Sequence, residues 1–144
     1  MDPLNTFYNH LNENKDNDKQ LLLKIDIEGA EWDILDNLNE ILLTNVAVLI
    51  VEFHGFEKIN DILIFKRVLK KINNIFSVFH VHGNNCSNLL SVNSKLFPNV
   101  IEVTYINNNY INSKQQLNVP LNDTDNMINC FPWQGYNLNY WLSE

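Results

Sequence analysis

The sequence predicts an α/β fold with a mostly parallel sheet, and two observations lead to this class. Short apolar runs rich in β-branched residues alternate along the chain with segments whose apolar residues recur at helical spacing. The run 46–53, VAVLIVEF, is apolar almost throughout, as is typical of a strand buried on both faces of a parallel sheet. Strands that alternate with helices in this way imply βαβ units with right-handed crossovers.

The chain opens with a polar, Asn-rich lead-in over residues 1–19. Four apolar residues allow one or two amphipathic turns there: Leu4, Phe7, Tyr8 and Leu11. Residues 12–19 contain no apolar side chain and are expected to be loop. The lead-in has no apolar stretch of the signal-peptide kind, so a cytoplasmic location is expected.

The first βαβ unit is expected directly after the lead-in. A short apolar run, 21–27, is followed by Gly29 and is predicted to be a strand. Apolar residues at helical spacing then run from Trp32 to Leu42, and acidic residues gather at the start of that helix, where the macrodipole favours anions. The apolar strand 46–53 completes the unit.

The rest of the chain continues the alternation. A helical stripe runs from Ile59 to Ile72, and strands are predicted at 75–81 and 100–106. No helical pattern separates these two strands, so the last strand is expected to pair antiparallel at an edge of the sheet. The tail, 107–144, has no periodicity and is predicted to be ordered coil that aromatic residues attach to the domain, among them Trp133 and Trp141.

Composition and charge exclude two classes of function. Acidic residues number 17 and basic residues 10, which gives a net charge of −7 and a pI near 4.9. Such a chain has no basic surface to neutralise phosphates, so nucleic-acid binding is not expected. No run of about eighteen apolar residues occurs, so no membrane span is expected either.

Polar residues follow three of the predicted strands, and ligands in open α/β sheets bind outside the carboxyl ends of strands. At the first end, Asp26 and Glu28 alternate along the strand, so both side chains point the same way. Two such carboxylates can hold a divalent cation or share acid–base work. Alternatively, Glu28 and Glu31 cap the following helix, and Asp26 bonds to neighbouring backbone.

The second and third strand ends carry histidines. Glu52 lies in an otherwise apolar strand, where burial without a partner such as Lys24 is costly, and His54 follows it. His80 and His82 share a face at the third end, a spacing that suits a metal site. Each has a structural alternative: Glu52 as a satisfied polar residue at the rim of the sheet, and the two histidines as packing or turn-capping residues.

The segment 21–35, LLLKIDIEGAEWDIL, resembles the KiDvEGaE signature of the FkbM-type methyltransferase family. Three later segments agree with that family in order and spacing: LIVEFHG, FSVFHVHGNNCS and the closing strand PNVIEVTY. The resemblance covers roughly residues 20–106. This range is therefore interpreted as one methyltransferase-like domain between the lead-in and the tail.

The resemblance implies S-adenosylmethionine as cofactor and a Rossmann-like, class I methyltransferase fold with a seven-stranded sheet. The four predicted strands resemble the last four, so a partial sheet is expected, the C-terminal half of such a domain. In the family, the first three strands and a glycine-rich loop hold most of the cofactor. No residue here matches that loop, because no two of the four glycines are close. We therefore expect this chain alone to bind S-adenosylmethionine weakly or not at all.

The resemblance also implies O-methylation of a sugar or natural product, so the expected partner is a small-molecule or glycan acceptor. Asp26 and Glu28 would lie beside the point where the methyl group and the acceptor meet. The candidate bases are His54, Glu28 and His82. Acid–base catalysis by these side chains is preferred to a mechanism with a divalent ion held by Asp26 and Glu52.

Two other interpretations stay open. Half a sheet exposes an edge strand that aggregates or recruits a partner, so the chain is alternatively a non-catalytic remnant or a subunit of a split enzyme. A homodimer or a partner chain would then supply the missing strands. The DxE and HxH pairs alternatively belong to a metal-dependent hydrolase, which bound metal in the purified protein would identify.

Overall fold

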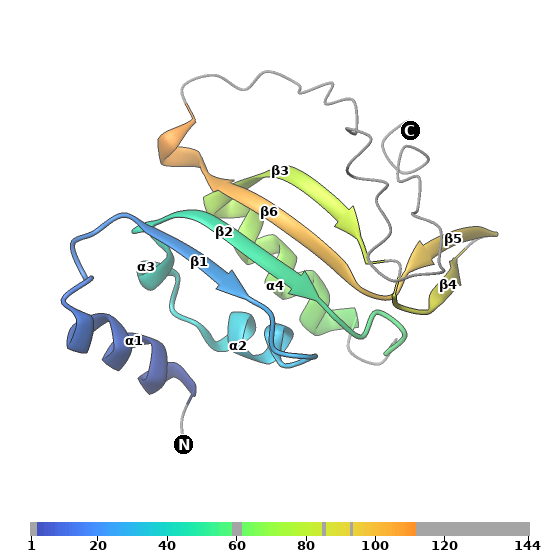
Figure 1. Cartoon of the computed structure of the whole chain (residues 1–144), viewed down its shortest axis with the longest axis horizontal. Coiled ribbons are helices and arrows are strands. Elements are labelled where there is room, and N and C mark those ends of the chain that lie inside the picture. The colour runs from blue at the N-terminus through green and yellow to red at the C-terminus, as the bar shows by residue number, and fades with distance from the viewer. Residues whose placement is uncertain (1–2, 59–61, 85, 93, 112–144) are drawn as a thin grey trace.

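The computed structural model describes residues 3–58, 62–84, 86–92 and 94–111, which form a mixed α/β domain (Figure 1). The main sheet has four strands in the order β1-β2-β6-β3, with the bounds Leu21–Ile25 (β1), Val46–Phe53 (β2), Ile101–Asn107 (β6) and Phe76–Gly83 (β3). Strands β1 and β2 are parallel, whereas β6 is antiparallel to both of its neighbours, β2 and β3. Strands β1, β2 and β3 therefore run in the same direction and end at the same edge of the sheet.

Helices cover one face of this sheet. Helices α2 (Glu31–Asn37) and α3 (Glu40–Leu43) connect β1 to β2, and α4 (Ile62–Ile75) connects β2 to β3. Helix α2 packs against α4, and the two contact β2 and β3 respectively. The N-terminal helix α1 (Pro3–Asn14) lies against α2 (Figure 1). Within the described ranges, no helix has the length and apolar character that crossing a membrane requires.

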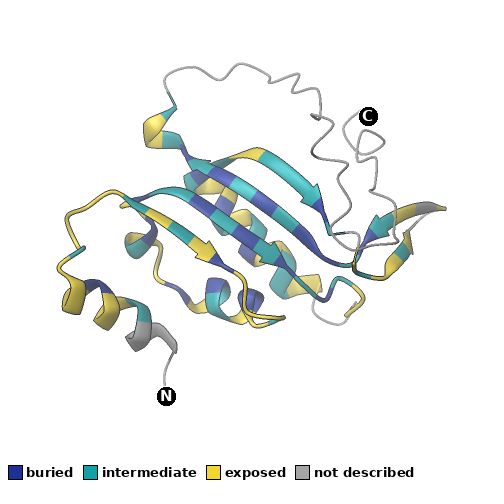
Figure 2. Ribbon diagram, viewed as in Figure 1, coloured by how far each residue is buried: buried dark blue, intermediate teal, exposed yellow. Residues whose placement is uncertain are grey.

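The core lies between the sheet and the helices. Alternate residues of the two central strands point into it and are almost completely buried: Leu49, Val51 and Phe53 from β2, and Ile101, Val103 and Tyr105 from β6. The residues between them face the other side of the sheet and are half-buried, which gives the alternating colours of Figure 2. The expectation that residues 46–53 are buried on both faces is therefore wrong, because Val48, Ile50 and Glu52 are only half-buried.

The last strand is antiparallel, as the sequence predicts, but it lies inside the sheet rather than at its edge. Glu102 and Thr104 alternate with apolar residues along β6 because they point to the half-buried face. Polar alternation of this kind is compatible with an interior strand when one face of the sheet is not fully covered. The interior position also gives the backbone of β6 hydrogen-bonding partners on both sides.

The helix expected between Trp32 and Leu42 is divided into α2 and α3. Leu38 is extended, and the side chain of Asn39 accepts a hydrogen bond from the backbone N–H of Ile41 as the cap of α3. Asparagine side chains compete with helical backbone bonds in this way, so the break is local in origin. Apolar periodicity continues through the break and does not reveal it.

Outside this core, the structure contains more regular elements than the sequence predicts, both in the lead-in and in the connection between β3 and β6. The lead-in forms a helix, α1, of 12 residues rather than one or two turns, and Leu11 on it is buried. The connection between β3 and β6 holds a hairpin of β4 (Leu89–Val92) and β5 (Lys95–Pro98), which periodicity does not predict. Residues 108–110 form a short 3-10 helix, and the remaining tail, 112–144, lies outside the described residues, together with Trp133 and Trp141.

Lys71 of α4 closes the C-terminal end of α2. Its ammonium group donates hydrogen bonds to the carbonyl oxygens of Leu35, Asp36 and Leu38 at 2.9, 2.7 and 2.9 Å. Leu35 and Asp36 belong to the last turn of α2, where carbonyl groups have no intrahelical partner, and Leu38 is the C-cap. A cation at this end also interacts favourably with the helix dipole. We expect Lys71→Met to lower the free energy of unfolding by about 2 kcal/mol in urea denaturation. Lys70→Met, at an exposed position of α4, is the matched control and should change it by less than about 0.5 kcal/mol.

Tyr105 of β6 makes the stability of the fold sensitive to alkaline pH. Burial raises the pKa of its phenol above the ordinary value of 10.0. The folded protein therefore keeps this proton at pH values where the unfolded chain has lost it, and stability falls as the pH rises through about 10. We expect the urea midpoint of Tyr105→Phe to fall less between about pH 8 and pH 10.5 than that of the wild-type protein. An equal fall in both proteins would contradict this.

Candidate functional site

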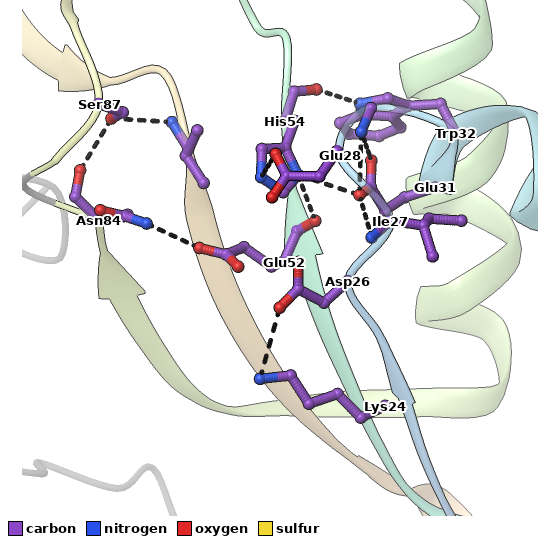
Figure 3. A network of polar contacts seen from close by, with 12 residues as sticks. Lys24, Asp26, Ile27, Glu28, Glu31, Trp32, Glu52, His54, Asn84 and Ser87 are labelled. Carbon is purple, nitrogen blue, oxygen red and sulfur yellow. Dashed lines mark hydrogen bonds and ion pairs between the residues drawn. The ribbon is translucent and has the colours of Figure 1, made fainter.

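A polar cluster forms where β1 and β2 end, and Figure 3 shows it from close by. Ile25 pairs with Val51 across the two strands, so the next residues, Asp26 and Glu52, are opposite each other in the same register. We call five residues the strand-end cluster: Asp26, Glu28, Glu31, Glu52 and His54. Because β1 and β2 are parallel, their carboxyl ends meet at one edge of the sheet, which brings the segments that carry the cluster together.

The loop between β1 and α2 is held in shape by Glu31, the first residue of α2. Its carboxylate accepts hydrogen bonds from the backbone N–H groups of Ile27 at 3.0 Å and Gly29 at 3.0 and 3.2 Å. Inside this clamp Glu28 and Gly29 have φ values of 57° and 108°. The left-handed conformation is unusual for a glutamate and costs about 1–2 kcal/mol, so its neighbours must impose it. Glu31 is completely buried, whereas the Glu28 side chain is 88% exposed.

His54 follows β2 and lies between Glu28 of this loop and Glu31 of α2. Its Nδ1 is 3.0 Å from Oε1 of Glu31 and 3.1 Å from the carbonyl oxygen of Glu52, both of which are acceptors. The proton of a neutral His54 ring is therefore assigned to Nδ1, which leaves the lone pair on Nε2. That nitrogen is 3.5 Å from Oε2 of Glu28. The indole N–H of Trp32 donates to the carbonyl oxygen of His54 at 2.7 Å and fixes the backbone of this residue.

The partner of Glu52 is Asn84 rather than Lys24. The amide of Asn84, just beyond β3, donates to Oε1 of Glu52 at 2.8 Å. Lys24 instead lies 3.3 Å from Glu102 and 3.8 Å from Asp26. Its hydrogen bond to Glu102 is the main reason why the pKa of this lysine is raised. The expected pairing of Lys24 with Glu52 is therefore corrected: the lysine lies on the half-exposed face and reaches across to β6.

His80 and His82 lie to one side of the strand-end cluster. His82 of β3 pairs with Glu102 of β6, and Glu102 pairs with Glu52 of β2 on the other side. Strand β6 therefore separates the backbones of His82 and Glu52. Two strand spacings amount to about 10 Å. His80 is level with Thr104, farther from the end of β3. The structure thus brings Asp26, Glu28 and His54 together and leaves His82 at the same edge but on another strand.

A metal ion is one possible occupant of this edge. Asp26, Glu52 and His54 each offer a ligand atom, and these atoms lie within 4.8 Å of one another. Both carboxylates already have a protein partner, since Lys24 lies near Asp26 and Asn84 donates to Glu52. The three groups therefore offer ligand atoms for a divalent cation and hydrogen-bond acceptors for a substrate at the same place.

Sequence reasoning gave Glu31 only the role of a helix cap. The structure differs: the N-cap of α2 is Ala30, no side chain caps this helix, and the Glu31 carboxylate instead binds loop amides that precede the helix. The same carboxylate also holds the imidazole of His54, which lies 23 residues away. Neither spacing nor periodicity carries a signal for a contact between a helix start and a strand end. The direction of β1 and β2 predicts only that the two segments meet at one edge.

Comparison with protein families matches residues 3–85 to the methyltransferase FkbM domain. The match covers more than half of the chain and includes the whole strand-end cluster, together with His82 and Asn84. Comparisons with curated proteins and with solved structures give no match. By this match, and with the KIDIEGAE turn at the centre of the cluster, the chain belongs to the FkbM methyltransferase domain family.

Proposed function

We propose that the protein is an S-adenosylmethionine-dependent O-methyltransferase that binds its acceptor hydroxyl at the strand-end cluster. Family membership indicates methyltransferase activity in general. One observation supports the finer assignment. An imidazole whose Nδ1 lies 3.0 Å from a buried carboxylate has its other nitrogen at the carboxyl edge of the sheet. This is the arrangement of an oriented general base.

Transfer of a methyl group from a sulfonium centre to a hydroxyl forms an O–C bond, breaks an S–C bond and releases the hydroxyl proton. The acceptor oxygen must be in line with the methyl group, and a base must take the proton. Nε2 of His54 takes the proton in this proposal, and the exposed carboxylate of Glu28 lies beside it to stabilise the imidazolium. Asp26 and Glu52 are acceptors for further hydroxyl groups of the same substrate.

The other candidate roles follow from position. His82, on β3, is too far from His54 to share its proton, so its place in this proposal is to contact a distant part of the acceptor. Sugars and natural products with several hydroxyl groups are the acceptor class that we propose. Carboxylate oxygens and the amide of Asn84 can bond several adjacent hydroxyls at once.

Methyl transfer from labelled S-adenosylmethionine to a panel of sugars and hydroxylated natural products tests the proposal. We propose that the chain alone binds the cofactor weakly, because its four glycines form no phosphate- or cofactor-type loop. The assay should therefore use millimolar cofactor. Calorimetric titration with S-adenosylhomocysteine measures the affinity independently. The absence of both cofactor binding and methyl transfer at that concentration would contradict the proposal. Hydrolysis that requires added metal would favour the hydrolase interpretation instead.

A further inference from the structure

We infer that Glu31 is the positioning residue of this site, holding His54 and Glu28 in their working arrangement through one buried carboxylate. The inference rests on the proposed function for its catalytic consequence. Its structural content, the ring tautomer of His54 and the shape of the loop, can be measured without any turnover. The experiments below keep these two parts separate.

The burial of Glu31 is the first argument. It is fully buried, and in the described part of the chain no other acidic or basic side chain is as buried. A charged group in this position is costly unless hydrogen bonds surround it. Donors come from two separate segments: the backbone of Ile27 and Gly29 in the loop, and Nδ1 of His54 after β2. The carboxylate therefore joins the carboxyl ends of β1 and β2.

The bond to His54 determines which ring nitrogen is basic. With Glu31 and the Glu52 carbonyl both facing Nδ1, this nitrogen carries the proton and Nε2 is the acceptor. Without the Glu31 carboxylate, only the carbonyl of Glu52, two residues away along the chain, would favour this tautomer. A role limited to holding the loop would need only the bonds to the Ile27 and Gly29 amides and would not require the contact with the ring.

The bonds to the loop determine where Glu28 lies. The two amides that Glu31 holds flank Glu28, whose φ of 57° is a left-handed conformation. This conformation places the Glu28 carboxylate 3.5 Å from Nε2 of His54. Release of the amides would let Glu28 return to the ordinary backbone region, and the carboxylate would move away from the ring.

Nitrogen-15 NMR of the imidazole tests the first part. In the neutral form of the ring, His54 of the wild-type protein is expected to carry its proton on Nδ1, the nitrogen that faces Glu31 and the Glu52 carbonyl. A ring protonated on Nε2 in the wild-type protein would overturn the inference without any variant. The result does not depend on whether the protein transfers methyl groups.

Glu31→Gln is the informative substitution because an amide offers one acceptor and one donor where the carboxylate offers two acceptors. In either orientation the new NH₂ group faces at least one of the three donors that Glu31 now satisfies. We therefore expect His54 to shift toward the Nε2–H tautomer, the Gly29 amide to exchange with solvent about 10-fold faster or more, or both changes together. A tautomer and an exchange rate that both match the wild-type protein would overturn the inference.

Asp33→Asn is the matched control, because Asp33 lies on the same helix, two residues away, and is exposed. It removes the same charge and should leave both readouts unchanged. In the methyltransferase assay, Glu31→Gln should lower kcat by about 10- to 100-fold and change KM by less than about threefold, as expected of a residue that orients a base. If Glu31→Gln changes the NMR readouts but the wild-type protein shows no methyl transfer, the proposed function is rejected and the positioning role of Glu31 is kept.

Discussion

His54→Ala should lower kcat for methyl transfer by about 10²- to 10⁴-fold, the usual contribution of a positioned general base. The structure gives the reason: Nδ1 is held by Glu31 at 3.0 Å, and Nε2 is the nitrogen that remains to accept the hydroxyl proton. The affinity for S-adenosylhomocysteine, measured by calorimetry, should change by less than about threefold, because the proton is accepted from the other substrate.

Added imidazole provides the sharpest control for this variant. The alanine substitution removes the whole ring, so free imidazole at millimolar concentration should restore part of the lost rate in His54→Ala. His10→Ala, at an exposed position of α1, should keep the wild-type rate with or without imidazole. Full activity in His54→Ala would show that another group takes the proton, and the same substitution at His82 would then be the next test.

Trp32→Ala should lower the free energy of unfolding by about 3–5 kcal/mol, the range for the removal of a large buried aromatic side chain. Trp32 is 5% exposed, and its ring centroid lies 4.4 Å from that of Phe53 and 4.2 Å from that of Phe65. Phe56 contacts it edge-on at 5.4 Å. A loss of this size is a large part of the total stability of a small domain, so urea denaturation should show a much lower midpoint.

Trp32→Phe separates packing from hydrogen bonding at this position. Phenylalanine keeps most of the aromatic contact but cannot donate to the carbonyl oxygen of His54, which Trp32 now does at 2.7 Å. We expect a loss of about 1–2 kcal/mol, well below that of Trp32→Ala. Equal losses in the two variants would mean that the hydrogen bond, not the packing, carries most of the stabilisation.

These two expectations are linked by Trp32, which contacts both the core and the strand-end cluster. Its side chain packs in the core and its indole N–H donates to the carbonyl oxygen of His54. The neighbouring residue, Glu31, holds the ring of His54. Two consecutive residues at the start of α2 therefore connect the hydrophobic core to the proposed base.

The sequence alone determined the types of most elements and the edge of the sheet where polar residues gather. Short apolar runs rich in β-branched residues predict β1, β2, β3 and β6, and apolar residues at helical spacing predict the helical segments between the first three of these strands. The signature KIDIEGAE and the residues EFH at the end of β2 place Asp26, Glu28 and His54 at carboxyl strand ends. The direction of parallel strands then brings these ends to one edge of the sheet.

Only the tertiary structure decided the place of β6 and the partners within the site. Strand order depends on which edges pair, and the residue pattern of β6 is compatible with either an edge or an interior position. The partners of Lys24, Glu52 and His54 come from β6, the end of β3 and the start of α2. Such contacts join side chains far apart in the chain, and side-chain hydrogen bonds depend on distances of a few ångströms that packing, not local periodicity, determines.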